Sequence, residues 1–584
     1  MLCIFMAWLY PFFEGSVPDA MQQIVALGCL AIASLLFGIS SISVVPVTII
    51  VAFVVAIIAA PAQYHGGQIA GIAGVVLACL GCCVGGNLQR NPSGLAWLLV
   101  AVVGAAFINA LEGLLQWFGL ANELWPWVVE TGRRGIAFGA FRQTNLFATF
   151  LCSGVVCAAW LLHLRRITNA MAWFLLFVMV FGVAASGSRT GGLELAALSV
   201  AGLVFRKQQT GEVTRVLVGS VFLFGLATVV LPFAANLHGF GFVSGAERVA
   251  NVSKDARLLI WSNVLSLIQE RPWTGWGWLG MGYGHYVTLY GHRFNELLDH
   301  AHNLPLQITV EFGLPFALTF FGVLGWAVYT GKPWLVIYSP PCEKEELAPN
   351  RSFAWALLLL IVGLHSMLER PLWYFGFLFL TGFAVGYLLL QPSEKSIEKI
   401  YGIWSIRLAT AGAVTLILLA LVAWQQYDKM LQIYKAPFND HEAQLVAINN
   451  ASEAWLFRGH LDFIKIGMVD VTLENAKEVK QSAESLLHFS AEPIVIQPLL
   501  LSLWYLHETN ELKLQAVRFC RAFPASFQRW SQFYATHPIL QASGNLTKFC
   551  QPSYLDSEGD ASKPIHFSVI SDITTSQPVS SKRR

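Results

Sequence analysis

Charged residues are scarce in this sequence. Asp, Glu, Lys and Arg together make up 12% of the chain, about half of their usual share in a soluble globular protein. The formal net charge is only +2, which provides no electrostatic basis for binding nucleic acid. Hydrophobic residues account for 55% of the chain, and the mean hydropathy is +0.56. This combination excludes an ordinary soluble protein and a nucleic-acid-binding protein.

Signals for cleavage and for metal binding are also missing. The first apolar run has no basic segment before it and leads directly into further apolar runs, so no cleavable signal peptide is expected. Cys79, Cys82 and Cys83 lie together in VLACLGCCVGG, but their neighbours are all apolar, which favours small-residue helix packing over half a metal site. Cys520 and Cys550 lie in the polar C-terminal part, where an oxidising compartment would allow a disulfide.

Long apolar runs are abundant in the first three quarters of the chain. Runs of roughly 18–25 residues are long enough to cross about 30 Å of hydrocarbon as helices. The candidate spans are roughly 1–10, 21–39, 43–60, 69–86, 95–118, 145–164, 170–186, 190–205, 214–234, 304–330, 353–369, 372–390 and 407–424. The first is too short to cross unaided, which indicates a re-entrant segment or a truncated start. The predicted fold class is an all-α polytopic membrane protein with about 12–13 transmembrane helices.

Basic residues set the expected direction of these spans. Arg90, Arg165, Arg206 and the other basic residues near span ends fall in alternate loops, which the positive-inside rule makes cytoplasmic. The amino terminus is then inside, and the carboxyl terminus is in the periplasm. The opposite loops nevertheless contain several arginines, namely Arg133, Arg134, Arg142, Arg189 and Arg257. Because external arginines run against this bias, they predict a task other than setting topology, at a site that faces the periplasm.

The same patterns divide the chain into five parts. We expect N-terminal transmembrane helices in 1–234, a large periplasmic loop with interfacial helices in 235–303, C-terminal transmembrane helices in 304–424, a periplasmic helical domain in 425–550 and a disordered tail in 551–584. Amphipathic helical pairs in the fourth part suggest a tetratricopeptide-like repeat.

The large loop contains one predicted interfacial helix. DARLLIWSNVLSLIQERPW places Leu258, Trp261, Val264, Leu265 and Ile268 along one apolar face. The glycine-rich run GWGWLGMGYGHY follows it. That run suits either a loop that closes over a ligand or an aromatic anchor at the membrane surface.

Three arginines and two amides gather in GRRGIAFGAFRQTNLFATF, at 132–150. Guanidinium groups bind phosphate oxygens in pairs, and glycines let the backbone approach closely, so the stretch predicts a phosphate cradle. Gln143 and Asn145 would complete such a site or bind sugar hydroxyls. The alternative is an interfacial anchor whose arginines reach lipid headgroups.

A single arginine interrupts two apolar runs in SGSRT, at 186–190. An arginine near the end of a span is costly unless it is paired or solvated. Arg189 is therefore a second candidate donor to an anionic ligand, although the stretch can also be a simple turn between helices.

The stretch HAHNLPLQITVEFG places His300, His302 and Asn303 at the mouth of a span, with Gln307 and Glu311 on the helix that follows. A histidine at this position is a natural general base, because its ordinary pKa near 6.5 leaves it largely neutral. An interfacial role and zinc binding through HxH are the alternatives. The external loops contain no cysteine or carboxylate cluster with ligand spacing, so no metal site is predicted.

A second polar corner occurs in LHSMLERPLWYFG, at 364–376. Trp373 and Tyr374 suit an interface anchor. Glu369 can form an ion pair with Arg370, orient a catalytic group or bind an acceptor.

The order of these stretches resembles the PglL-type bacterial O-oligosaccharyltransferases. GAFRQTNLFA, GSRT, a large loop ending in HAHNLPLQITVEFG, then HSMLERPLWY and a C-terminal domain follow the pattern of the superfamily that also holds the O-antigen ligases and polymerases. The resemblance implies transfer of an oligosaccharide en bloc from an undecaprenyl diphosphate carrier to Ser or Thr hydroxyls of exported proteins such as pilins. It implies a multi-pass protein of the bacterial inner membrane whose active site faces the periplasm, with no cofactor and no nucleic acid partner.

The resemblance also assigns roles to the candidate residues. It implies that His302, beside Asn303, is the base in preference to His300, and that the external arginines hold the donor diphosphate. We expect the substrate to be oriented by Gln143, Asn145, Gln307, Glu369 and Tyr374. An O-antigen ligase or polymerase that uses a glycan or lipid A-core acceptor is the alternative. A polysaccharide flippase would need polar residues at mid-membrane and related halves, and the polar residues here gather at one surface.

Overall fold

The structure is a computed structural model of the chain. It describes residues 2–10, 19–39, 44–60, 62–132, 134–206, 209–239, 256–290, 293–331, 348–389, 396–437 and 440–534. The regular structure of these residues is helical, and seven of their helices are long and apolar enough to cross a membrane. The predicted all-α polytopic membrane protein is confirmed. Arg133, Cys550 and the predicted tail at 551–584 lie outside the described residues.

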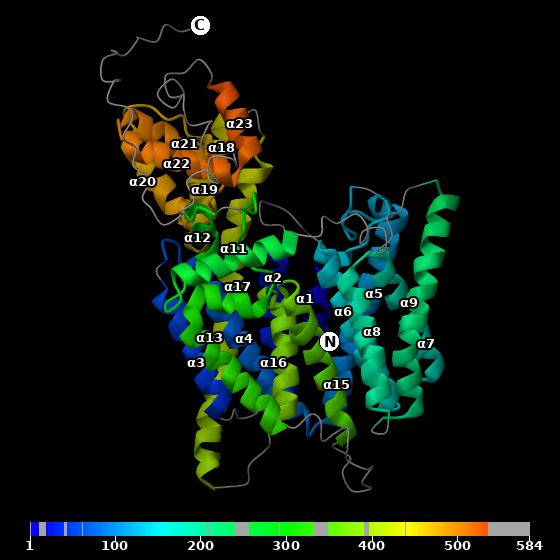
Figure 1. Ribbon diagram of the computed structural model, residues 1–584. Coiled ribbons are helices and arrows are strands. Elements are labelled where there is room, and N and C mark those ends of the chain that lie inside the picture. The colour runs from blue at the N-terminus through cyan, green and yellow to red at the C-terminus, as the bar shows by residue number, and fades with distance from the viewer. Residues whose placement is uncertain are drawn as a thin grey trace. The chain divides into compact units, whose positions relative to one another are not determined.

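The helices follow the predicted spans closely in the first half of the chain (Figure 1). They are α1 (Leu2–Leu9), α2 (Ala20–Phe37), α3 (Val44–Ala59), α4 (Gly66–Leu88), α5 (Pro92–Phe118), α6 (Thr144–His163), α7 (Asn169–Ala185), α8 (Arg189–Val204) and α9 (Gly211–Leu237). Apolar runs locate these helices well because a lipid-facing backbone must satisfy its own hydrogen bonds, which a helix does within the segment.

The second half departs more from the predicted bounds. It contains α13 (Leu304–Gly331), α15 (Ala348–Leu358), α16 (Phe375–Leu389), α17 (Ser396–Lys435) and α18 (His441–Asn450). Helix α17 is 40 residues long, far beyond the predicted span 407–424, because its polar ends are also good helix formers. The predicted span 353–369 continues beyond α15 as a π-helix (Leu359–Leu364) and a 3-10 turn (His365–Met367).

Helices α4 and α16 pack through glycines. A Cβ atom on Gly382 or Gly386 of α16 would overlap the backbone oxygen of Ala78 or Cys82 of α4. Close approach of this kind is how membrane helices associate through small residues. Cys79, Cys82 and Cys83 are free cysteines, and Gly81 and Gly85 of the same stretch lie directly against the backbone of Phe379 and Phe383.

The described residues form two compact units that do not follow chain order. The first comprises the described residues of 1–254, 272–278 and 300–461, and the second comprises the described residues of 255–271, 279–299 and 462–584. The second unit contains α11 (Ala256–Glu270), α12 (Met281–Val287), α20 (Ala476–Leu487), α21 (Pro493–Tyr505), α22 (Thr509–Ala522) and α23 (Pro524–Phe533). Helix α19 (Arg458–Met468) begins in the first unit and ends in the second.

Helix α11 exposes only part of its predicted apolar face. Val264 and Ile268 are buried, whereas Leu258 and Leu265 are exposed. The buried side is completed by Ile260 and Leu267. In the same unit Cys520 of α22 is disulfide-bonded.

The glycine-aromatic run is attached to a kink in α13. Gly313 has a left-handed φ of 80° inside the helix, which an L side chain would strain. The freed backbone groups bind the run instead: the N–H of Trp276 donates to the oxygen of Val310 at 2.8 Å, and the N–H of Leu314 donates to the oxygen of Pro272 at 2.8 Å. Trp278 stacks on Trp373 with ring centroids 6.4 Å apart. Residues 272–278, which include the first part of the run, therefore belong to the first unit.

Candidate functional site

The HAHN turn is held in a strained conformation immediately before α13. His302 has a left-handed φ of 50°, which a non-glycine residue adopts only where surrounding contacts impose it. Its backbone N–H donates to Nδ1 of His300 at 2.8 Å, and the N–H of Ala301 donates to Oε1 of Gln307 at 2.7 Å. Asn303 accepts the N–H of Leu306 at 3.1 Å and so caps the helix. Gln307 and Asn303 thus position the turn.

His300 is a structural member of this turn. Because its Nδ1 accepts a backbone N–H, the neutral ring carries its proton on Nε2. Nε2 is buried, and the ring meets Trp373 edge to face with centroids 4.6 Å apart. Burial, the neighbouring His302 and Arg370 lower the pKa of His300 to about 2. A ring that cannot present Nδ1 to a substrate is poorly suited to act as the base.

His302 lies against a carboxylate. Its Nδ1 is 3.0 Å from Oε2 of Glu369. Since an ionised carboxylate only accepts hydrogen bonds, Nδ1 carries the proton and Nε2 is left as the basic nitrogen. Within the described part of the chain Nε2 makes no hydrogen bond, and the side chain is 33% exposed. Of the interpretations of Glu369 drawn from the sequence, this geometry matches the orientation of a catalytic group.

A chain of hydrogen bonds joins this pair to the SGSRT turn. Oε1 of Glu369 accepts from Nδ2 of Asn145 at 3.0 Å. The Oδ1 atom of Asn145 accepts from the hydroxyl of Ser188 at 2.7 Å. Ser188 is the N-cap of α8, and its Oγ also accepts the N–H of Gly191 at 3.1 Å. His302 and the start of α8 therefore belong to one polar assembly. It is built from α6, α8, the turn before α13 and residues 365–374.

Arg189 is the first residue of α8 and is exposed. It makes no ion pair within the described part of the chain. The amino end of a helix carries partial positive charge and unpaired N–H groups, which favour a bound anion. Arg189 and this helix end together suit a phosphate ligand.

Two buried amide side chains of α5 bind the backbone of the 132–142 loop. Gln116 accepts the N–H groups of Phe138 at 2.9 Å and Gly139 at 2.8 Å, and Asn109 accepts the N–H of Ala140 at 2.9 Å. These bonds leave Arg134 and Arg142 exposed at the surface of the first unit. The loop backbone is thus tied to α5 at Phe138, Gly139 and Ala140.

Arg142 and Arg370 interact electrostatically with Asp19, a carboxylate that was not among the predicted site residues. Asp19, the residue before α2, accepts a hydrogen bond from the hydroxyl of Tyr374 at 3.2 Å. Burial raises the pKa of Asp19, while Tyr374, Arg142 and Arg370 act to lower it. Tyr374 is therefore linked to this charged group. Only its place before an apolar run marks Asp19 in the sequence.

Three predicted site residues remain, and the structure describes two of them. Gln143 precedes α6, and its Oε1 is buried without a hydrogen-bond partner among the described residues. Arg257 lies on α11 in the second unit. Arg133 lies outside the described residues.

A second polar layer lies one helical turn below the site. The hydroxyl of Thr149 donates to Oε1 of Glu194 at 2.7 Å and also meets Nδ1 of His365. All three side chains are fully buried. Thr149 follows Asn145 by one turn of α6, and the N–H of Glu369 donates to the oxygen of His365 at 2.8 Å. The same segments that carry the upper layer thus carry the lower one. In the sequence, the lower layer is marked by a lone carboxylate, Glu194, in the apolar run GGLELAALSV.

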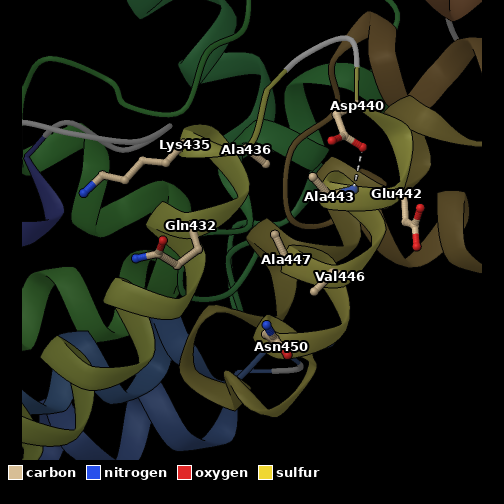
Figure 2. A pocket seen from close by; sticks show the side chains of 9 residues that line it. All are labelled: Gln432, Lys435, Ala436, Asp440, Glu442, Ala443, Val446, Ala447 and Asn450. Carbon is tan, nitrogen blue, oxygen red and sulfur yellow. Dashed lines mark hydrogen bonds between the residues drawn. The ribbon is translucent and has the colours of Figure 1, made fainter.

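No group of three or more His, Cys, Asp or Glu side chains suited to a metal ion occurs among the described residues. A pocket of about 480 Å³ lies between the end of α17 and the start of α18 and is lined by Gln432, Asp440 and Asn450, among others (Figure 2). Asp440 caps α18 by accepting the N–H of Ala443 at 2.9 Å. None of the predicted site residues lines this pocket.

Two families match parts of the chain. The O-antigen ligase family matches residues 174–321, and the family described as virulence factor membrane-bound polymerase, C-terminal, matches residues 353–537. The general O-oligosaccharyltransferase of Acinetobacter baylyi is 25% identical over 352 residues, which are 57% of this chain and 56% of that protein. The ComP-specific O-oligosaccharyltransferase of the same species is 24% identical over 335 residues, 56% of this chain and 57% of that protein. The chain thus spans little more than half the length of these relatives.

Proposed function

This chain resembles the PglL-type protein O-oligosaccharyltransferases of the O-antigen ligase superfamily, as its motifs predicted, and we propose that it shares their activity. It transfers an oligosaccharide en bloc from undecaprenyl diphosphate to Ser or Thr hydroxyls of exported proteins such as pilins. It does so as a multi-pass protein of the bacterial inner membrane, at the periplasmic face. The observation that carries the proposal is the hydrogen-bonded path from His302 through Glu369, Asn145 and Ser188 to the start of α8.

His302 acts as the general base. A hydroxyl is a poor nucleophile, and Nε2 of His302 takes its proton as the oxygen attacks the anomeric carbon. Glu369 keeps the proton on Nδ1 and stabilises the imidazolium that forms, which is the role of the acid in a Ser-His-Asp triad. The exposed side of His302 leaves room for an acceptor segment.

Arg189 and the amino end of α8 stabilise the leaving group. The bond between the anomeric carbon and the diphosphate oxygen breaks, and its electron pair leaves with that oxygen. Preformed guanidinium and N–H donors aimed at such developing charge are the strongest means of lowering a barrier of this kind. Arg142 lies on a loop fastened to α5 and is a further donor for the diphosphate.

The proposed reaction needs no cofactor and no metal ion, because guanidinium groups supply the positive charge that a metal would otherwise provide. We expect transfer in the purified system to be unchanged after chelation with EDTA. A loss of transfer that Mg²⁺ or Mn²⁺ restores would contradict this part of the proposal.

An O-antigen ligase or polymerase is the second candidate, because both matched families are named for such proteins. It would use the same donor chemistry with a glycan hydroxyl as acceptor. The two candidates are separated by supplying lipid-linked oligosaccharide with either a pilin or a lipid A-core acceptor and identifying the product by mass spectrometry.

The catalytic assignment is tested by the His302→Ala variant in the same assay. We expect its transfer rate to fall at least about 10²-fold, the usual contribution of a positioned general base. His65→Ala is the matched control, because His65, near the start of α4, contacts Gln68. Transfer by His302→Ala at nearly the wild-type rate would rule out His302 as the base.

A further inference from the structure

Within the second unit, the segment that starts at α12 lies along α22. The hydroxyl of Tyr286 donates to Oε1 of Gln515 at 2.7 Å. In the orientation that satisfies both ends of the amide, the Asn295 side chain donates to the backbone oxygens of Arg521 at 3.1 Å and Arg293 at 3.2 Å. These bonds bring Arg293 beside the end of α22.

Helix α22 carries two further arginines on this side. Arg518 follows Gln515 by three residues, and Arg521 follows Arg518 by three. Positions three residues apart are neighbours on a helix surface. Arg293 and Arg518 interact electrostatically with Tyr286, and Arg521 interacts electrostatically with Arg293. Three guanidinium groups from two distant parts of the chain therefore lie near one another.

Arg293 is held in place by its own segment. Its Nη1 donates to the oxygen of Thr288 at 3.0 Å, and its guanidinium carbon lies 5.6 Å from the centre of the Tyr290 ring. His285 supports the same segment through contacts to Tyr290 at 3.3 Å and to the oxygen of Phe294 at 3.0 Å. A guanidinium fixed in this way loses little freedom when a ligand binds.

The three arginines carry positive charge that no carboxylate of the described residues contacts. None of them forms an ion pair within the described part of the chain, and Nε of Arg293 and Nε of Arg518 are buried without a hydrogen-bond partner there. Burial lowers the pKa of Arg293 to about 10, and Arg521 acts in the same direction. A buried, unpaired donor of this kind destabilises a protein unless an acceptor reaches it.

The surrounding carboxylates define the charge of a suitable ligand. Glu270 and Glu511 interact electrostatically with Tyr290 and Tyr286, but neither forms an ion pair with the arginines. Against three guanidinium groups they leave about one net positive charge. A monoanionic carboxylate matches that balance better than a phosphate, which carries about two negative charges at neutral pH.

We infer that Arg293, Arg518 and Arg521 form a binding site for the carboxylate of an acidic peptide segment. Guanidinium forks bind carboxylates in pairs with defined geometry, so the site would select peptides by the position of Asp or Glu. If the proposed transferase function holds, this peptide belongs to the acceptor protein, and the site contributes to acceptor choice.

Equilibrium binding of a labelled peptide tests the inference. The full chain in nanodiscs is titrated against a fluorescein-labelled Ser/Ala peptide that contains two Glu residues, and against the same peptide with Gln in their place. We expect the Glu peptide to bind at least about tenfold more tightly, and Arg518→Ala combined with Arg521→Ala to remove that preference. Arg529→Ala is the matched control, because Arg529 lies on the next helix and its side chain contacts Ser526.

Two kinds of result would overturn the inference, and neither depends on glycan transfer. Equal binding of the two peptides, or an undiminished preference in the double variant, would overturn the inference. Competition by inorganic phosphate far more strongly than by acetate would show a phosphate site and would also overturn it. The titration contains no lipid-linked donor, so its failure leaves glycan transfer untouched, and a failure of transfer leaves the binding result standing.

Discussion

Nδ1 of His302 lies 3.0 Å from Oε2 of Glu369, across 67 residues of sequence. The same carboxylate accepts from Asn145 at 3.0 Å. One side chain thus connects the turn before α13 with the start of α6, and through Ser188 with the start of α8. This geometry gives each member of the site a separable role.

The Glu369→Gln variant tests the orientation of the base. The amide can donate a hydrogen bond to Nδ1 and so favours the tautomer in which Nε2 carries the proton. We expect the rate of glycan transfer to fall about 10²–10⁴-fold, with less than about a threefold change in KM for the donor. Glu212→Gln, which alters an exposed ion pair with Arg165, is the control. A change confined to KM would indicate that Glu369 binds substrate instead.

The Arg189→Lys variant tests paired binding of the diphosphate. Lysine keeps the charge but cannot form two parallel hydrogen bonds, so we expect the maximal transfer rate to fall about 10–100-fold. Arg215→Lys on α9 serves as the control, because Arg215 is exposed and its Nε bonds the backbone oxygen of Gly211. An unaltered rate in steady-state kinetics would exclude Arg189 as a phosphate ligand.

The Thr149→Val variant tests the buried layer below the site. Removal of the hydroxyl leaves Glu194 and His365 without their shared partner in a fully buried position. We expect the unfolding free energy to fall by about 1–3 kcal/mol, seen as a lower Tm in detergent. Thr149→Ser should retain most of the stability. Thr228→Val, at an exposed position of α9, should have little effect, and equal Tm values for all three variants would contradict the assigned role.

Acid pH should destabilise the HAHN turn through His300. The folded pKa is about 2 and the ordinary value is 6.5, so between these values the unfolded chain binds a proton that the folded chain does not. Stability then falls as the pH drops below 6.5, by about 1.4 kcal/mol per pH unit, and is independent of this group above 6.5. His300→Gln retains an acceptor for the His302 N–H and should flatten the slope of Tm against pH. An unchanged slope would show that His300 does not titrate on unfolding.

The transmembrane helices were predictable because the information for them is local. The apolar runs at 95–118 and 145–164 became α5 and α6 with shifts of only a few residues. The same reasoning failed for the length of α17, because its ends mix polar and apolar residues and so lack a continuous apolar run. It also could not show that residues 279–299 of the large loop join the C-terminal helices in one unit, because that grouping depends on contacts such as Tyr286 with Gln515.

The candidate site was found in part. His302, Asn145, Arg189 and Glu369 stood out because polar residues at the ends of apolar runs are expensive and conspicuous. Asp19 was missed, because a single acidic residue before a span is ordinary in sequence. Gln307 and Asn303 were expected to touch substrate or take part in catalysis, and the motif did not reveal that Gln307 accepts the N–H of Ala301 in the turn and Asn303 that of Leu306 in α13. A motif shows that a residue matters without showing what its side chain contacts.

By itself, the sequence determined that this chain crosses a membrane repeatedly as helices and concentrates its polar chemistry at a few span ends. Both conclusions follow from the cost of leaving apolar surface in water and polar groups in lipid, which is a property of each segment alone. Only the tertiary structure decided which histidine has a carboxylate behind it and which arginine stands at the end of the same hydrogen-bonded path. Those relations depend on how α6, α8 and the 365–374 corner pack together, and no single segment contains them.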